Sequence, residues 1–515
     1  MATHLAITPP LLASPRYSDG MRDDEIRRHL TQMNPWWRAV VSGTAPTAWV
    51  SDSRTLRDLS RHDMGHRSTI LDDIATGPLD DQLVVLSGPR RIGKSVTLLQ
   101  TIERLCTRDD VDPRQIIHVP CDGMTVQDLR RVLVVGRALT SSVDQEGTRR
   151  RVWLFDEISA IRGWSAVLKG ARDNTDLGDD TLVATGSRWA DDEDIEGNLL
   201  AGRAGRGTRR RRTLLPMSFR DHVRATLPNL ALPETLHPGA LQGAEARRTF
   251  ASYELFVDDL DLAWQSYLTS GGFPRAVAEH AQLGAVTDGY MADLEAWLHR
   301  DVEPTAGPES IPLLLDALSR RATSPLSVAS AAQDLGYASK DTFDLRLRRM
   351  IASHALLRCP QREDGRFVPR TQAKYYLTDP LLAWLPQRRR AGVGAPDMTR
   401  LTEATVAVTL ARAVDELDEG RWLHGDTIGY TRTGGDREID LAPVTVPSPD
   451  GATSTTPIEC KWVDRGWKGE ARTITGRFGY GIVATKTLLD LDGPVWAVPA
   501  PLLAAALLPQ GPAAR

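Results

Sequence analysis

The sequence predicts an α/β fold whose core is a doubly wound parallel sheet, and three observations lead to this expectation. Short apolar runs occupy residues 83–87, 116–119, 152–155 and 182–185. Most of these runs are rich in β-branched residues, as buried strands are, and helical patterns separate them. The first run also leads directly into a glycine-containing loop. Strands that alternate with helices favour a parallel sheet, because the helices provide the crossover connections.

The loop after the first run follows the pattern G-x-x-x-x-G-K-[ST], the phosphate-binding Walker A motif. The glycines let backbone N–H groups wrap a phosphate, and the following helix points its N-terminus at the same charge. Lys94 is expected to reach the β- and γ-phosphates of ATP, and the Ser95 hydroxyl to bind Mg²⁺. The loop consists of Gly88, Pro89, Arg90, Arg91, Ile92, Gly93, Lys94 and Ser95.

Two later strands supply the rest of an ATP hydrolysis site. Residues 151–157 form an apolar strand that ends in Asp156 and Glu157, a Walker B pattern. We expect Asp156 to hold the Mg²⁺ shell and Glu157 to polarise the attacking water as general base. The alternative is a strand that simply ends in an acidic pair. Ser187 follows the fourth apolar run and is either a sensor of the γ-phosphate or a hydroxyl that caps the strand.

Composition and charge exclude several classes of protein. The chain has 515 residues, a formal net charge of −4 and 41% hydrophobic residues, as expected of a globular protein of roughly three domains. The slightly acidic balance gives no overall argument for nucleic-acid binding. Four scattered cysteines show no metal-ligand spacing, which favours a reducing, cytoplasmic location. The N-terminus lacks a basic signal-peptide segment and prolines interrupt the apolar stretch 495–509, so we expect no membrane segment.

Lysine is scarce in this chain, because only seven of the 63 basic residues are lysines. Genomic base composition explains such a skew in bulk. A lysine kept in an arginine-rich chain is nevertheless a candidate for a role that needs a compact ammonium group. The seven are Lys94, Lys169, Lys340, Lys374, Lys461, Lys468 and Lys486.

Residues 202–212 hold six arginines in eleven positions. One interpretation makes Arg203 an arginine finger that a neighbouring subunit supplies to the γ-phosphate. A second interpretation is a contact with the phosphate backbone of DNA. The third is a solvated, flexible basic loop.

Helix, turn, helix and hairpin follow one another between residues 327 and 370, which indicates a winged-helix domain. The second helix, 341–354, has Asp341 as its expected N-cap and one apolar face. Arg346 and Arg349 lie off that face. The functional interpretation places this helix in a DNA major groove, and the alternative is a helix pair that only joins domains.

The C-terminal region carries a carboxylate–lysine pattern. Glu459 and Lys461 form the only E-x-K of the chain and lie on a predicted strand, so both side chains point to the same side. Asp440 from a paired strand is expected to join Glu459 in binding one or two Mg²⁺ ions, with Glu403 completing the shell from a helix. Lys461 would orient or activate water at a phosphodiester. The alternative is a degenerate site whose carboxylates serve stability.

Several motifs together resemble those of bacterial and archaeal ATP-binding proteins of the AAA type, over most of the chain. The family commonly has Thr where this chain has Ser95, and an Arg after Gly at the position of Arg203. The C-terminal pattern resembles the PD-(D/E)XK nuclease superfamily, although no Pro-Asp precedes Asp440 here. The AAA-like motifs are NPWW at 34–37, the loop 88–95, LFDEIS, Trp164 with Lys169, ATGSR, Gly202-Arg203, LLPMSFRDHV at 214–223, GGFP at 271–274 and Arg300-Asp301.

These resemblances imply an Mg²⁺-dependent ATPase that acts on DNA through a C-terminal nuclease-like domain, with a homo-oligomer left open. The alternatives are a nucleotide-dependent protein-binding switch and a DNA-remodelling ATPase, either with an inactive nuclease fold. The expected segments are a helical extension (1–80), an AAA-type P-loop ATPase core (81–225), a helical lid region (226–305), a winged-helix domain (306–390) and a restriction-endonuclease-like α/β domain (398–500).

Overall fold

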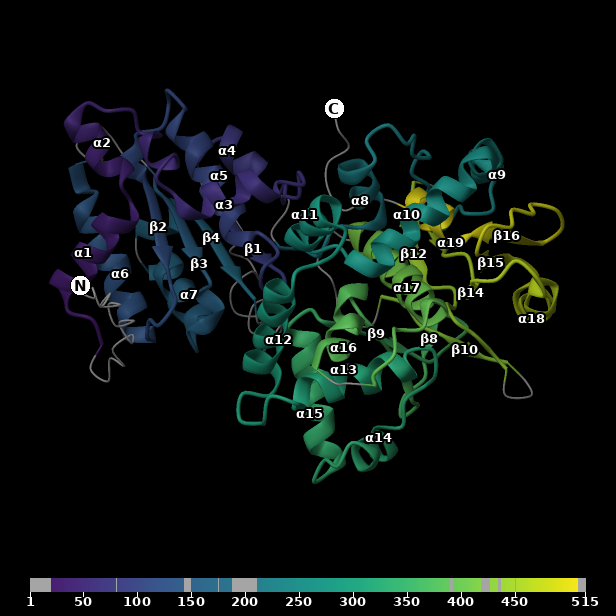
Figure 1. The fold of residues 1–515 in the computed structure, drawn as a ribbon. Helices are drawn as coiled ribbons and strands as arrows, with labels where there is room; N and C mark the ends of the chain where they lie inside the picture. Colours follow the sequence, from purple (N-terminus) through teal and green to yellow (C-terminus); the bar gives the residue numbers. More distant parts are fainter. Residues whose placement is uncertain are drawn as a thin grey trace, which may run out of the picture.

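The computed structural model describes residues 20–507, except residues 80, 143–149, 175, 188–210, 390–391, 418–426, 434–436 and 450. Arg203, the predicted arginine finger, lies outside the described residues. Figure 1 shows a sheet flanked by helices in the N-terminal part, and a mixed helical and stranded part that follows it. Among the described residues, no helix is both long and apolar enough to cross a bilayer.

The predicted α/β core is a five-stranded sheet in the order β2-β3-β4-β1-β5, and every neighbouring pair is parallel. The four predicted apolar runs form its first four strands, which are buried along almost their whole length because helices cover both faces. The strands are β1 (Leu83–Ser87), β2 (Ile116–Pro120), β3 (Val152–Asp156), β4 (Thr181–Gly186) and β5 (Arg211–Thr213).

Three crossover helices cover the two faces of this sheet (Figure 1). They are α5 (Lys94–Cys106), α6 (Val126–Leu139) and α7 (Trp164–Asn174). Helix α5 connects β1 to β2 in one direction along the sheet, whereas α6 and α7 connect strands in the other direction. Right-handed crossovers therefore place α5 on the face opposite to α6 and α7. The carboxyl ends of β1, β3 and β4 meet at one edge, where the predicted site residues follow.

The edge strand β5 corrects one interpretation of the arginine-rich segment. Arg211 and Arg212 lie in β5 and are 1% and 5% exposed, so they are not part of a solvated loop. The Arg212 guanidinium Nη2 donates to Glu416 Oε1 at 2.7 Å. These two arginines therefore stabilise the junction between the sheet and the C-terminal part of the chain.

The NPWW segment seals the other edge of the sheet. Asn34 is fully buried, and its side-chain amide accepts from His118 N at 2.6 Å and donates to His118 O at 3.0 Å. The indole N–H groups of Trp36 and Trp37 both donate to Ile116 O, at 3.0 and 2.9 Å. Side chains thus satisfy the backbone of β2 that no further strand pairs with. The nearby N-terminal helices are α1 (Asp23–Met33), α2 (Trp36–Ser42), α3 (Arg54–His62) and α4 (Asp72–Thr76).

Replacing Asn34 by Ala is expected to lower the free energy of unfolding by about 2–3 kcal/mol. The change leaves buried backbone groups of β2 without partners, and each costs roughly 1–3 kcal/mol. Chemical denaturation measures the effect. The matched control is Val41→Ala, because Val41 is 85% exposed on α2. Equal stability of the two variants would show that water replaces the Asn34 contacts.

The second part of the chain contains most of the remaining helices. The helices are α8 (Phe219–Thr226), α9 (Ala244–Ser252), α10 (Val257–Ser270), α11 (Pro274–Leu283), α12 (Asp288–Val302), α13 (Ser310–Arg321), α14 (Val328–Asp334), α15 (Lys340–Ala352), α16 (Leu385–Arg389), α17 (Met398–Leu417), α18 (Trp467–Phe478) and α19 (Ala500–Ala506). The strands are β6 (Leu356–Pro360), β7 (Arg362–Glu363), β8 (Arg366–Phe367), β9 (Ala373–Leu377), β10 (Thr431–Arg432), β11 (Glu438–Ile439), β12 (Thr445–Ser448), β13 (Gly451–Ser454), β14 (Ile458–Cys460), β15 (Gly481–Thr485) and β16 (Val495–Pro499).

The helix pair α14 and α15 is present, but two details differ from the prediction. Ser339, not Asp341, is the N-cap of α15, and its hydroxyl accepts from Thr342 N at 3.2 Å. Arg346 and Arg349 do not project freely, because both contact the C-terminal end of α12. The Arg346 guanidinium pairs with Glu303 at 3.0 Å. These contacts attach α15 to the C-terminal end of α12.

The C-terminal strands form a three-stranded parallel sheet in the order β14-β15-β16, with α18 as the crossover between β14 and β15. The polar segment before β14 folds into a hairpin, β12 paired with β13. The final helix α19 does not pack only on this sheet. It also contacts α8, α10 and α17 (Figure 1), so the chain's last helix lies against elements far earlier in the sequence.

Candidate functional site

The loop between β1 and α5 has the backbone geometry of a phosphate cradle. Gly88 has φ 152° and Gly93 has φ 103°, both in regions that side chains disfavour. A Cβ atom on Gly88 would lie 2.3 Å from the carbonyl oxygen of Leu214, so only glycine fits there. Ser95 lies in the first turn of α5, directly after Lys94. This loop therefore matches the predicted Walker A geometry at its glycines.

Lys94 is almost fully buried at the centre of this loop. Its Nζ donates to Gly88 O at 3.0 Å and to Pro89 O at 2.9 Å, and it pairs with Glu157 at 3.4 Å. Burial lowers the pKa of the Lys94 ammonium, and the carboxylates of Glu157 and Asp156 offset only part of this effect. The loop thus holds one desolvated positive charge where a phosphate would need it.

Asp156 and Glu157 follow β3 and are fixed from the neighbouring strand β4. The Thr185 hydroxyl donates to Asp156 Oδ1 at 2.8 Å and accepts from Glu157 N at 3.1 Å. Glu157 has φ 55°, a left-handed conformation that costs energy for a residue with a side chain. Such strain is typical of functional positions. The sequence analysis missed Thr185, although it stands in the ATGSR segment two residues before Ser187.

Ser187 contacts the predicted general base. Its hydroxyl donates to Glu157 Oε2 at 2.9 Å. Burial alone would raise the pKa of Glu157, but Lys94, Arg90 and this hydroxyl outweigh it and hold the pKa below its usual value. Glu157 is therefore an ionised carboxylate held by two side chains, a lysine and a serine.

Three of the four variable residues of the loop have side chains that contact other parts of the chain. Arg90 pairs with Asp301 at 3.1 Å, and Arg91 pairs with Asp293 at 3.4 Å. Both aspartates belong to helix α12. Ile92 is buried in the core. Only their backbone N–H groups are thus available to a phosphate. The sequence motif gave no sign of the two ion pairs, which tie the loop to the helical part of the chain.

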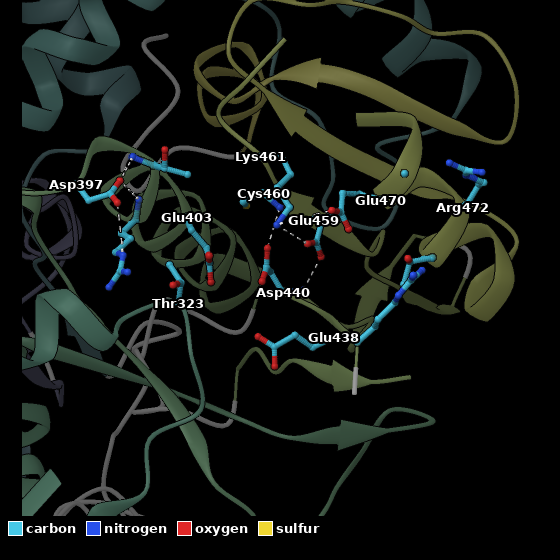
Figure 2. Close-up of a pocket in the computed structure, with 15 residues that line it drawn as sticks. Thr323, Asp397, Glu403, Glu438, Asp440, Glu459, Cys460, Lys461, Glu470 and Arg472 are labelled. Atoms are coloured by element: carbon cyan, nitrogen blue, oxygen red, sulfur yellow. Dashed lines mark hydrogen bonds and ion pairs between the residues drawn. The ribbon is translucent and has the colours of Figure 1, made fainter. Parts of the chain in front are cut away.

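A second candidate site is a cleft of about 750 Å³ beside β14. Figure 2 shows Glu403 from α17, Asp440 from the segment after β11 and Glu459 from β14 pointing towards this cleft. The three are about 5% exposed. The cleft therefore has an acidic floor, and its lining also includes four cationic side chains, Arg400, Arg437, Arg472 and Lys461.

Backbone pairing brings Asp440 and Glu459 together. Leu441 and Ile458 form an antiparallel bridge, which places the preceding and following residues side by side. Glu459 Oε2 accepts from Asp440 N at 3.2 Å, and Asp440 Oδ2 accepts from Cys460 N at 2.9 Å. A single antiparallel bridge thus brings the two carboxylates together, although β11 and β14 belong to different sheets.

Lys461 lies at the edge of the same cleft, with its side chain 41% exposed. Its Nζ lies 3.5 Å from Glu459 Oε1 and 4.0 Å from Glu470 Oε1. Burial opposes its charge, but Glu459, Asp440 and Glu470 together raise the pKa of Lys461. Glu459 and Lys461 therefore face the same side, as the alternation of strand side chains predicts.

Lys374 is the main residue of this site that sequence reasoning missed. Its ammonium group is fully buried and contacts Asp440 at 2.7 Å, Glu438 at 2.9 Å and Glu403 at 3.2 Å. Burial alone would lower the pKa of Lys374, but these three carboxylates raise it well above its usual value. One signal was available: Lys374 is a rare lysine within the apolar run AKYYL.

Two carboxylates of the cleft, Glu403 and Glu459, have raised pKa values. Burial and the nearby Asp440 raise the pKa of Glu403 to about 7, against the opposing effect of Lys374. The same two causes raise the pKa of Glu459 well above its usual value. Carboxylates in such a setting are suited to a cation.

The donors of this cleft fit a divalent metal ion in kind, because Mg²⁺ and Mn²⁺ prefer carboxylate oxygens. The arrangement differs from the predicted three-carboxylate shell. No three His, Cys, Asp or Glu side chains among the described residues stand in a geometry that could hold a metal ion. The ammonium of Lys374 contacts both Glu403 and Asp440, so it takes part of the place that the prediction gave to a metal.

Comparison with known proteins identifies the N-terminal part. Residues 80–223 match the family model described as an AAA domain. No curated protein matches the chain. The match assigns an AAA-type domain to this segment, and its five-stranded parallel sheet is consistent with a P-loop NTPase core.

Solved structures resemble the chain only in part. The Walker-type ATPase of Pyrococcus abyssi is 16% identical with a TM-score of 0.36, over 59% of this chain and 91% of that one. The RuvB Holliday junction branch migration motor of Thermotoga maritima is 15% identical with a TM-score of 0.25, over 62% and 90%. The ORC1 protein of Aeropyrum pernix, solved in complex with DNA, is 14% identical with a TM-score of 0.28, over 66% and 89%. With TM-scores this low, these similarities carry no argument about the function of this chain.

Proposed function

We propose that this chain is an Mg²⁺-dependent ATPase that acts on DNA and couples ATP hydrolysis to its C-terminal, nuclease-like cleft. The observation that carries the proposal is the lining of that cleft. Its floor is acidic, and four cationic side chains also line it: Arg400, Arg437, Arg472 and Lys461. Cationic side chains bind the phosphates of a nucleic acid, and a carboxylate floor suits chemistry at a phosphodiester.

At the ATP site, the proposal gives each residue a task. Mg²⁺ bound with ATP neutralises phosphate charge and would be held by Ser95 and Asp156. Lys94 contacts the β- and γ-phosphates with its buried ammonium. Glu157 accepts a proton from the attacking water, and its low pKa keeps the carboxylate ionised at neutral pH. Ser187 fixes the orientation of Glu157, so its proposed role as a sensor acts through that carboxylate.

At the cleft, Asp440 and Glu459 would hold a divalent ion that stabilises charge on the phosphodiester. Lys461 is exposed enough to meet a phosphate oxygen or a water molecule, and Glu459 holds its ammonium near the floor. Glu403 is bound by Lys374 and Tyr376, so we give it a supporting role. The winged-helix segment around α14 and α15 would have a structural role, because Arg346 and Arg349 of α15 contact the end of α12.

The test is a cleavage assay beside an ATPase assay. The purified chain is incubated with ATP and either Mg²⁺ or Mn²⁺, together with linear, circular or single-stranded DNA. We expect cleavage of at least one of these DNAs and an ATPase rate that changes when DNA is added. Intact DNA in every reaction would refute the nuclease activity.

The second candidate is an ATPase with an inactive nuclease fold, acting as a DNA-remodelling factor or as a protein-binding switch. The contact of Lys374 with both Glu403 and Asp440 favours it, because an ammonium there weakens a metal shell. The two versions separate in the same assay. Without cleavage, an ATPase rate that DNA changes indicates remodelling, and a rate that DNA leaves unchanged indicates the switch.

A further inference from the structure

A lysine from outside the C-terminal segment sits inside the carboxylate cluster of the cleft. Lys374 belongs to β9, which pairs with β6 in the preceding part of the chain. Its side chain is fully buried, and its Nζ lies within 3.2 Å of an oxygen of Asp440, Glu438 and Glu403. The cluster is therefore built jointly by two segments that the sequence assigns to different domains.

The position of Lys374 is fixed from several sides. Tyr376 lies two residues further along β9, on the same face, and its hydroxyl donates to Glu403 Oε1 at 2.8 Å. The Lys374 ammonium also lies 5.7 Å from the ring centroid of Tyr430, a distance at which cation–π attraction operates. A charge held in this way cannot leave the cluster without moving a buried strand.

Charge balance limits what else the cluster can bind. Glu403, Glu438, Asp440 and Glu459 supply four carboxylates, whereas Lys374 and Lys461 supply two ammonium groups. Lys374 alone contacts three of these four carboxylates, so it places a positive charge where a metal ion would have to bind. Each divalent ion added beside this buried ammonium raises the positive charge of a poorly solvated site, at a high cost.

We propose that Lys374 is a built-in cation that positions Glu403 and Asp440, takes Glu403 out of the metal shell, and limits the cleft to one weakly held divalent ion on Asp440 and Glu459. This inference rests on the proposed metal-binding cleft. Asp440 Oδ1 accepts from Lys374 and Oδ2 accepts from Cys460 N, so both oxygens already have a partner. Glu403 Oε1 accepts from both Lys374 and Tyr376. Lys374 is thus a positioning residue.

The experiment measures Mn²⁺ binding to the full chain by calorimetry and electron paramagnetic resonance, at pH 8 and without nucleotide. The wild type is expected to bind one Mn²⁺ that Asp440→Asn and Glu459→Gln abolish. Lys374→Met removes the charge at similar volume and is expected to raise the Mn²⁺ affinity at least tenfold, because a fixed positive charge no longer repels the ion. The matched control is Lys486→Met, whose lysine pairs with Asp261 away from the cleft.

A second variant tests the claim about Glu403 without removing the buried lysine. Glu403→Gln is expected to lose at least tenfold less Mn²⁺ affinity than Glu459→Gln. If Lys374→Met folds only with Mn²⁺ present, as circular dichroism would show, the ion has replaced the lysine as the inference requires. Unchanged or weaker Mn²⁺ affinity in folded Lys374→Met would overturn it, and so would equal losses in Glu403→Gln and Glu459→Gln. A Lys374→Met chain that Mn²⁺ fails to restore would also overturn it.

The outcome is separable from that of the proposed nuclease activity. Tighter Mn²⁺ binding by Lys374→Met in a protein that never cleaves DNA would uphold the role of Lys374 and refute the nuclease. DNA cleavage by the wild type, with no change of Mn²⁺ affinity in Lys374→Met, would uphold the nuclease and refute the role of Lys374. Wild-type protein that binds no Mn²⁺ while Lys374→Met also binds none would refute both.

Discussion

Glu157→Gln is expected to lower the rate of ATP hydrolysis by about 10²–10⁴-fold, which is the usual contribution of a general base. The amide cannot accept the proton of the attacking water. It keeps the size of the carboxylate and can still accept from the Ser187 hydroxyl, so the left-handed turn at this residue should survive. Turnover is measured by phosphate release, and ATP binding by fluorescence of a labelled nucleotide.

Two further variants separate binding from chemistry. Lys94→Ala removes the buried ammonium and is expected to lose both ATP binding and turnover. Ser187→Ala removes only one hydrogen bond to Glu157, and a roughly tenfold slower turnover is expected with binding unchanged. Should Glu157→Gln hydrolyse ATP at the wild-type rate, another residue must act as the base.

Asp440→Asn is expected to reduce DNA cleavage by at least about 10³-fold while ATP hydrolysis without DNA continues at the wild-type rate. The substitution keeps the shape of the side chain but removes the charge that faces Lys374 and lies beside Glu459. Lys461→Met should reduce cleavage as well, because its ammonium is the exposed cation next to Glu459. Cleavage of a supercoiled plasmid, followed by gel electrophoresis, measures both effects.

The control for these cleavage variants is Lys468→Met. Lys468 lies on α18, near Trp467 and away from the carboxylate contacts, so cleavage should persist. Cleavage that persists at the wild-type rate in Asp440→Asn would mean that the cleft is not the nuclease site, or that a contaminating nuclease is present.

Local sequence predicted the four strands that position the candidate ATP site. The apolar runs, the glycine loop and the acidic pair after β3 are each short segments that can be recognised separately, and the parallel sheet brings their ends together. The residues that hold these groups from other elements were not predicted. Thr185 fixes Asp156 from β4, and Asp301 binds Arg90 from the end of α12. Both residues stand in AAA-like motifs, but the motifs do not tell which partner each residue contacts.

The residues of the cleft show more clearly what could not be predicted from the sequence. Asp440, Glu459 and Lys461 were found because strand alternation places Glu459 and Lys461 together and an antiparallel bridge adds Asp440. Lys374 lies 66 residues before Asp440 and 29 residues before Glu403, and β9 packs against α17, which carries Glu403. The scarcity of lysine had flagged it without a role. Glu403 was predicted as a metal ligand, but its contacts with Lys374 could not be known from the sequence.

The position of α19 sets an order for folding during synthesis. The Arg220 guanidinium of α8 donates to Ala505 O at 2.5 Å, and Leu236 N donates to Ala506 O at 2.6 Å. These partners lie more than 260 residues apart, so they meet only after α19 has left the ribosome. The P-loop sheet, whose strands end at Thr213, can form while translation continues. Until α19 packs against them, α8 and α10 have exposed apolar faces. We therefore expect nascent chains at this stage to depend most on chaperones.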